Sequence, residues 1–182
     1  MSRLVSEVRT EFRTTDDITV ERLARLPYLN ACLEEGLRIY PPVPTSLPRV
    51  VPEGGAMVDG HFIPAGTSVA VSQYATYRSE QNFADPDNFH PERWLSAQNA
   101  TADDDIARFA NDDRAAMQPF STGPRNCIGR NLAYHEARLL LCSVLWNFDL
   151  ELDPRSHGWD KQPVYTLWEK YPLWVKVAER KN

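Results

Sequence analysis

The sequence predicts a mainly α-helical protein with small antiparallel β-sheets. Two stretches, 27–40 and 130–147, carry apolar residues at the three- and four-residue spacing of an amphipathic helix. Between them, short β-branched or alternating runs at about 50–72 are separated by Gly, Pro and Asp, which is typical of short strands joined by tight turns. The length of 182 residues allows one domain with a sizeable core.

The first predicted helix covers about 27–40. Pro27 suits the first helical turn, leucines recur every four residues, and two prolines prevent continuation beyond Tyr40. Glu35 and Arg38 lie three residues apart, so their side chains project from one face and can pair. Considered alone, such a pair is a solvated surface contact that contributes a few tenths of a kcal/mol.

Short strands are expected at 56–58, 60–63 and 67–71, because turn residues separate these runs. Antiparallel pairing follows from the shortness of the connections. Arg49 comes just before this region, and its simplest interpretation is a solvated arginine at a strand edge.

The stretch of about 80–118 is expected to be irregular. It contains the run Phe89-His-Pro91-Glu92-Arg93-Trp94 and, further on, two groups of aspartates at 103–105 and 112–113. These aspartates lack the ordered glycine and glutamate pattern of a calcium loop. Residues 98–117 are therefore predicted to form a solvated loop rather than a cation site.

A single cysteine stands in a loop shaped by glycines, at about 120–129. The loop reads Phe120-Ser-Thr-Gly123-Pro-Arg125-Asn-Cys127-Ile-Gly129. Its glycines permit tight turns, and the helix that follows directs its free N–H groups and positive dipole end toward the sulfur. Both features favour a thiolate, so Cys127 is the candidate iron ligand. Arg125 has a donor fork suited to a carboxylate such as a haem propionate, and Phe120 is expected to pack beside the sulfur.

Two other interpretations of Cys127 are possible. A lone cysteine is often a small buried apolar residue. A zinc site is the other alternative, but the four histidines of the chain, His61, His90, His135 and His157, lack the short ligand spacing of structural zinc sites. The remaining cysteines, Cys32 and Cys142, lie on the predicted helices and are interpreted as buried packing residues.

The C-terminal part is predicted to hold one long helix and one hairpin. Apolar residues recur at helical spacing over 130–147, so this helix is expected to be part of the core. The alternating run 173–177 is expected to pair with 163–168, giving a hairpin over about 163–178.

The cysteine loop resembles the signature of the cytochromes P-450. The pattern Phe-x-x-Gly-x-Arg-x-Cys-x-Gly is met at every fixed position, and Ala133 and Glu136 continue it. The run from Phe89 is similar to the family segment Phe-x-Pro-Glu-Arg-Phe, with Trp94 in the last place. The resemblance covers nearly all of residues 1–182 and reaches only the C-terminal third of the family. It therefore implies the C-terminal part of the cytochrome P-450 fold, an incomplete haem-thiolate domain.

The resemblance implies roles for individual residues. The expected cofactor is haem, iron protoporphyrin IX, with the Cys127 thiolate as axial ligand. The residues expected around it are Phe120, Gly123, Arg125, Gly129, Ala133 and Arg49. A buried structural ion cluster is expected to join Glu35, Arg38 and Arg93. Thr45 and Ser46 lie in a segment that runs along the substrate cavity in the family, and the 165–170 tip of the hairpin is expected near the same cavity. No residue is assigned a certain catalytic role, because the family's oxygen-activating pair is located upstream of the region that the chain resembles.

The implied activity is monooxygenation, in which an apolar small molecule is hydroxylated with O₂ and electrons from a flavoprotein reductase. The chain is expected to be inactive alone, because it matches only the cysteine side of the haem pocket. One alternative is a non-catalytic or degenerate haem-binding remnant. Another is a haem-thiolate isomerase or dehydratase, although such members tend to depart from the usual cysteine loop. The runs Tyr40-Pro-Pro-Val-Pro and Phe62-Ile-Pro-Ala-Gly are similar to eukaryotic, especially fungal, members that modify secondary metabolites.

The composition of the chain indicates which partners and which cellular location are expected. The chain has a formal charge of -5, with 42% hydrophobic and 25% charged residues, and no basic stretch that indicates nucleic-acid binding. It has no membrane segment of 18 apolar residues and no signal peptide, so an intracellular location is expected, while relatives are usually anchored in the endoplasmic reticulum membrane. Arg125, Arg130 and Arg138 are candidates for the reductase-docking face.

Overall fold

The computed structural model describes residues 1–180. The α-helices are α1 (Ser2–Glu11), α2 (Val20–Leu23), α3 (Pro27–Ile39), α4 (Gln73–Tyr77) and α5 (Arg130–Asn147). Short 3-10 turns are η1 (Thr15–Asp17), η2 (Pro91–Trp94), η3 (Ile106–Phe109), η4 (Arg114–Ala116), η5 (Gly123–Arg125) and η6 (Pro154–Ser156). No helix within residues 1–180 has an apolar run long enough to cross a bilayer.

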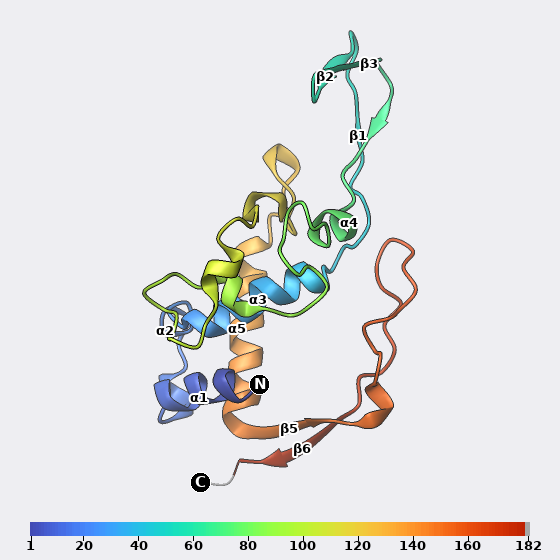
Figure 1. Ribbon diagram of the computed structural model, residues 1–182. Helices are drawn as coiled ribbons and strands as arrows, with labels where there is room; N and C mark the ends of the chain where they lie inside the picture. Colours follow the sequence, from blue (N-terminus) through green and yellow to red (C-terminus); the bar gives the residue numbers. More distant parts are fainter. Residues whose placement is uncertain (181–182) are drawn as a thin grey trace.

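The strands form separate two-stranded antiparallel sheets. β1 (Arg49–Val50) pairs with β4 (Ser68–Val69), and β2 (Ala56–Val58) pairs with β3 (His61–Ile63). The connection between the last two strands places Asp59 and Gly60 at positive φ, as a tight hairpin turn requires. This part of the chain extends away from the helices as a narrow arm (Figure 1).

The helical core is built from segments that are far apart in the sequence. Helices α1, α2 and α3 all pack against α5. Their shared buried residues are Leu4, Val8, Phe12, Leu23, Leu26, Leu29, Cys142 and Leu145. Pro27 at the first turn begins α3, and the helix ends at Ile39, with Tyr40 as the C-cap residue directly before the two prolines.

Helix α5 is less buried than its apolar pattern predicts. Only Cys142 and Leu145 are buried, whereas Leu132, Leu140 and Val144 are exposed. The helix is part of the core, as expected, but only through one side, and the rest of its apolar stripe is exposed. The physical reason is that α1, α2 and α3 cover one side of α5, and the apolar stripe is wider than that side.

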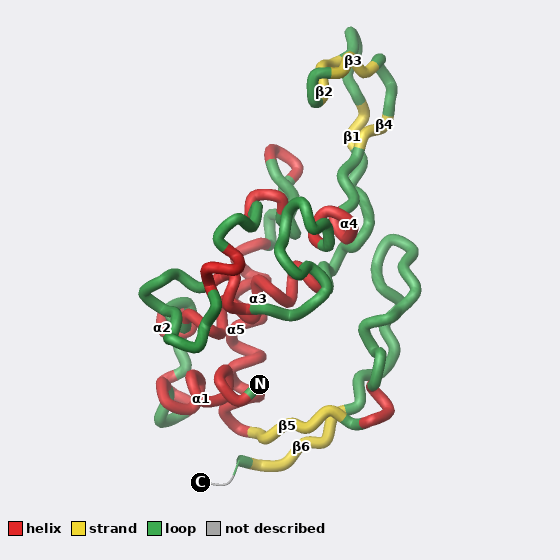
Figure 2. Tube along the Cα trace, viewed as in Figure 1, coloured by secondary structure: helices red, strands yellow, loops and turns green. Residues whose placement is uncertain are grey.

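The segment 80–118 is loop interrupted by short helical turns, as Figure 2 shows. Its inner side packs around Phe83 and Met117, which join Tyr77 of α4 in a second buried apolar cluster. The segment thus lies over α3, because η2 packs directly against that helix.

The C-terminal strand pairs differently from the prediction. β6 (Val175–Glu179) pairs with β5 (Phe148–Leu152), the strand that follows α5 directly, in a register from Phe148 opposite Glu179 to Leu152 opposite Val175. Residues 163–168 instead close on themselves through a bridge between Val164 and Trp168. The predicted hairpin was wrong in its partner because the five-residue pairing with β5 makes more backbone hydrogen bonds than the short 163–168 run allows.

Candidate functional site

The cysteine loop is closed by backbone hydrogen bonds. The Cys127 N–H donates to the Phe120 carbonyl (2.9 Å), and the Asn126 N–H donates to the Gly123 carbonyl (3.0 Å). Gly123 has φ +72°, in the left-handed region that glycine enters at no steric cost. Ser121 adopts a similar angle (φ 61°), which for a serine is a strained conformation held by the surrounding loop.

Cys127 lies immediately before the first turn of α5. Gly129 is the N-cap residue, and its carbonyl accepts the hydrogen bond of the Ala133 N–H (2.9 Å). A Cβ added to Gly129 would lie 3.8 Å from the Cys127 Sγ, so the sulfur lies over the start of the helix. An anionic sulfur is stabilised at that end of the helix dipole.

The three cysteines differ in their surroundings. The side chain of Cys127 is exposed, Cys32 is half-buried and Cys142 is buried. Burial raises the pKa of the Cys32 thiol to about 12 and that of Cys142 to about 11. Both therefore remain neutral thiols near pH 7, whereas Cys127 is the one presented to the outside of the fold.

Aromatic and charged groups flank the loop on the side of α5. The Phe120 ring packs against Tyr134, with ring centroids 5.2 Å apart, and the Arg130 guanidinium lies 5.9 Å from each ring centroid. The Tyr134 hydroxyl donates to Glu34 on α3 (2.8 Å). Burial, followed by the nearby Glu34 carboxylate, raises the pKa of Tyr134 above its usual range, so the hydroxyl stays protonated.

The exposed face of the loop suits a flat apolar group that carries carboxylates. Ile128 projects fully into the open beside Cys127, and a cavity of about 510 Å³ lined by both apolar and polar residues extends from the loop to the β1–β4 arm. Arg49 lies along that cavity and donates to the Ser121 hydroxyl (3.3 Å), while Arg125 is exposed within the loop. A haem needs a ligand for its iron, an apolar surface for its flat ring and cations for its propionates. The Cys127 thiol, the apolar lining and the two guanidinium groups meet these needs, so these residues fit this cofactor.

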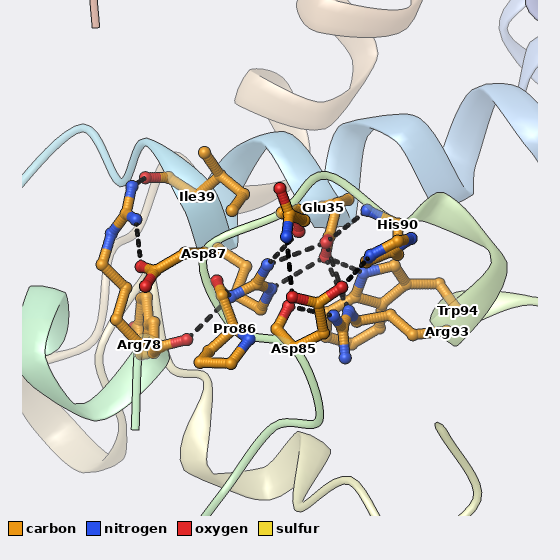
Figure 3. A network of polar contacts seen from close by, with 12 residues as sticks. Glu35, Ile39, Arg78, Asp85, Pro86, Asp87, His90, Arg93 and Trp94 are labelled. Atoms are coloured by element: carbon orange, nitrogen blue, oxygen red, sulfur yellow. Dashed lines mark hydrogen bonds and ion pairs between the residues drawn. The ribbon is translucent and has the colours of Figure 1, made fainter. Parts of the chain in front are cut away.

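A buried ion cluster lies on α3 and η2 (Figure 3). Arg38 donates to the Glu35 carboxylate through Nη2 (2.8 Å) and Nε (2.9 Å), and Arg93 Nε lies 3.2 Å from the same carboxylate. All three side chains are fully buried. The indole of Trp94 and the backbone N–H of His90 complete the coordination of Glu35 at 2.9 and 2.8 Å.

Burial by itself would raise the pKa of Glu35. The hydrogen bonds and charge of Arg38, together with the donors from His90 and Trp94, outweigh this effect and lower the pKa below its usual value. Glu35 is therefore ionised at neutral pH. The pair is a buried contact, and the interpretation of Glu35 and Arg38 as a solvated surface pair does not apply.

Sequence reasoning missed a fourth member of the cluster, Asp112. Its carboxylate pairs with Arg93, and the same carboxylate accepts the Ala84 N–H (2.7 Å). Asp104, in the same acidic stretch, is half-buried, with its side chain 6% exposed, and pairs with Arg3 of α1. The prediction of a solvated loop at 98–117 was therefore wrong at both positions. The sequence pattern of the five aspartates at 103–105 and 112–113 does not distinguish the two shielded ones from the other three.

The two residues expected near a substrate lie on the segment after α3. The Thr45 hydroxyl donates to the Thr166 carbonyl (3.1 Å), and Ser46 forms an antiparallel bridge with Ser72. The segment 45–49 is thereby held between the C-terminal loop and α4, and its continuation at Leu47 and Arg49 lines the cavity beside the cysteine loop.

In residues 1–180, no group of three or more His, Cys, Asp or Glu side chains is arranged so that it could hold a metal ion.

Comparison with known proteins identifies the family of this chain. The profile of the cytochrome P450 family matches residues 1–176, and the chain belongs to this family of monooxygenases. Cytochrome P450 monooxygenase efuB of Hormonema carpetanum is 63% identical over 177 residues, which cover 97% of this chain and 34% of that protein. Cytochrome P450 monooxygenase astJ of Aspergillus oryzae is 48% identical, covering 98% of this chain and 34% of that protein. The averantin hydroxylase of Dothistroma septosporum is also 48% identical, over 99% of this chain and 33% of its own length.

The chain spans about a third of the length of these relatives. It matches the C-terminal portion of the cytochrome P450 fold, with helices and small antiparallel sheets. Haem, a substrate, O₂ and a redox partner are general features of the family.

Proposed function

We propose that this chain holds haem through the Cys127 thiolate and contributes that site to a monooxygenase. The reaction is hydroxylation of an apolar small molecule with O₂ and electrons from a flavoprotein reductase. The single observation that carries the proposal is the exposed Cys127 at the start of α5, in a loop closed onto the Phe120 carbonyl. When haem is bound, it supplies the oxygen chemistry, and a thiolate ligand favours O–O cleavage.

The residues assigned to the haem site bind or position the cofactor in this proposal. Gly123 and Gly129 allow the loop to pass close to the cofactor, while Ala133 and Phe120 border it. Arg49 and Arg125 bind the propionates. Oxygen activation is assigned to no residue of this chain, which we propose is inactive alone.

The ion cluster of Glu35, Arg38 and Arg93 has a structural role in this proposal. It fixes the irregular 80–118 segment on α3, and through that segment the approach to the cysteine loop. Removal of one partner leaves an uncompensated buried charge, which is costly.

Substrate and electron donor lie on opposite sides of the loop in this proposal. Thr45 and Ser46 line the substrate side, and the substrate class is an apolar secondary metabolite, in keeping with the similarity to fungal hydroxylases. Exposed arginines, Arg125 and Arg130, favour docking of an acidic reductase surface on the side of α5.

Replacing the Cys127 sulfur tests whether this residue is the iron ligand. The protein and its Cys127→Ser variant are titrated with iron protoporphyrin IX, reduced and exposed to carbon monoxide, with Cys32→Ala as the matched control. We expect the absorption band typical of thiolate ligation in the unsubstituted protein and in Cys32→Ala, and its complete loss in Cys127→Ser. Absence of the band from the unsubstituted protein, or its persistence in Cys127→Ser, would contradict the proposal.

A further inference from the structure

Two side chains of helix α4 form hydrogen bonds with Gln118, which lies just before the cysteine loop. Gln73 and Tyr77 are four residues apart, so both side chains lie on one face of the helix, and both are buried. The Tyr77 hydroxyl accepts the hydrogen bond of the Gln118 N–H (2.8 Å). Gln73 Nε2 approaches the Gln118 carbonyl on the other side (3.4 Å). One short helix therefore contacts both backbone polar groups of Gln118.

Gln118 is connected to Cys127 by two further hydrogen bonds. Its carbonyl accepts the Ser121 N–H (2.9 Å), which begins the strained turn of the loop. Phe120, two residues after Gln118, accepts the Cys127 N–H (2.9 Å). The position of Gln118 thus determines where the closing bond of the loop is placed.

The backbone of Tyr77 reaches the ion cluster. Arg38 Nη1 donates to the Tyr77 carbonyl (2.8 Å) while the same guanidinium binds Glu35. The Tyr77 ring is only 1% exposed and packs with Phe83 and Met117, so the side chain has little freedom to move.

The Tyr77 hydroxyl is neutral near pH 7, because burial raises its pKa to about 12. A neutral hydroxyl accepts a backbone N–H without introducing a charge beside the apolar cluster.

We propose that Tyr77 is a positioning residue, which fixes the cysteine loop relative to the ion cluster by joining Gln118 through its hydroxyl and Arg38 through its carbonyl. The consequence for ligation rests on the proposed function of Cys127. The mechanical link itself does not, because every contact in it joins two groups of this chain.

Tyr77→Phe separates the two contacts. The substitution keeps the ring and the backbone carbonyl bound by Arg38, and removes only the acceptor of the Gln118 N–H. Tyr28→Phe is the matched control, since Tyr28 also loses a hydroxyl hydrogen bond, to Glu92 (3.0 Å), away from the loop. Hydrogen exchange of the chain without haem is the measurement.

We expect the Gln118 and Cys127 amides to exchange about tenfold faster in Tyr77→Phe, and at an unchanged rate in Tyr28→Phe. Unchanged exchange in Tyr77→Phe, or equal acceleration in both variants, would overturn the inference. If Tyr77→Phe does not fold, the unsubstituted chain decides. Its Gln118 amide, which donates to the buried Tyr77 hydroxyl, should exchange as slowly as the Cys127 amide, and exchange at the rate of an unprotected amide would overturn the inference.

A second readout concerns the haem-loaded protein. Loosening of the loop in Tyr77→Phe should convert part of the thiolate-type carbon monoxide band into the form given by a neutral thiol, whereas Tyr28→Phe should leave the band intact. An intact band in Tyr77→Phe would refute the effect on ligation. A missing band in the unsubstituted protein would instead refute the proposed function, and the exchange result would still decide the role of Tyr77.

Discussion

Asp112 pairs with Arg93 in a place from which water is excluded: the two side chains are 1% and 0% exposed. With Asp112 included, the cluster contains two carboxylates, of Glu35 and Asp112, and two guanidinium groups, of Arg38 and Arg93. Their formal charges therefore cancel. The acidic stretch before the cysteine loop therefore supplies a counter-ion to the interior.

Replacing Asp112 by Asn should destabilise the fold strongly. The variant leaves Arg93 with a buried positive charge that Glu35 must share with Arg38, and breaking such a pair costs about 3–5 kcal/mol. Urea unfolding of the chain, followed by circular dichroism, measures the change. Asp103→Asn is the control, since Asp103 is exposed in the same stretch and should change the free energy of unfolding by less than about 0.5 kcal/mol. Equal effects of the two substitutions would show that Asp112 does not act as a buried counter-ion.

Glu7 provides the N-terminal cap of α3 from a different helix. Leu26, at the N-cap position, makes no side-chain cap bond, and the Glu7 carboxylate instead accepts the N–H groups of Tyr28 (2.8 Å) and Leu29 (2.7 Å). Glu7→Ala should lower the free energy of unfolding by about 1–2 kcal/mol. Glu53→Ala, at an exposed position on the arm, serves as the reference in the same denaturation experiment. A loss no larger than that of the reference variant would mean that water caps α3 equally well.

Asp153 should make stability depend on acid pH. The side chain and backbone N–H groups of Arg155 donate to the carboxylate and lower its pKa to about 2. A carboxylate with a lowered folded-state pKa stabilises the fold above its unfolded value near 3.8, and this contribution is lost as the pH falls through about 2. Asp153→Asn should therefore have a lower Tm than the unsubstituted chain at pH 7, and the two Tm values should converge near pH 2. A constant difference across this range would contradict the assignment.

Trp168 fastens the C-terminal loop to the end of α3. Its ring stacks on Tyr40 with centroids 4.4 Å apart, and its Nε1 donates to the Pro41 carbonyl (2.6 Å). Trp168→Leu removes the stack and the hydrogen bond, together about 1–3 kcal/mol, so trypsin should cleave after Lys170 about tenfold faster. Tyr165→Leu, at the exposed tip of the same loop, should leave the cleavage rate unchanged. If both variants are cleaved at the rate of the unsubstituted chain, the stack does not restrain the loop.

Local sequence signals were sufficient for helices α3 and α5 and for the turns of the cysteine loop, but not for α1, α2 and α4. Pro27 and the prolines after Tyr40 delimit α3, and the apolar repeat delimits α5, because these signals act over one or two helical turns. The turn at Gly123 likewise follows from a property of one residue, its freedom to take positive φ. The family was also identifiable from the short run around Cys127, since the spacing of its ligand, glycines and arginine lies within ten residues.

Pairing and burial depended instead on contacts between distant segments. The choice of β5 as the partner of β6 depends on the folded path that brings residues 148 and 179 together, and alternation along a strand does not specify a partner. Asp112 is inside and Asp103 outside although both lie in one acidic stretch, because burial is set by where Arg93 lies. Period and composition describe each segment separately, whereas a buried charge is stable only beside a counter-ion that the rest of the fold delivers.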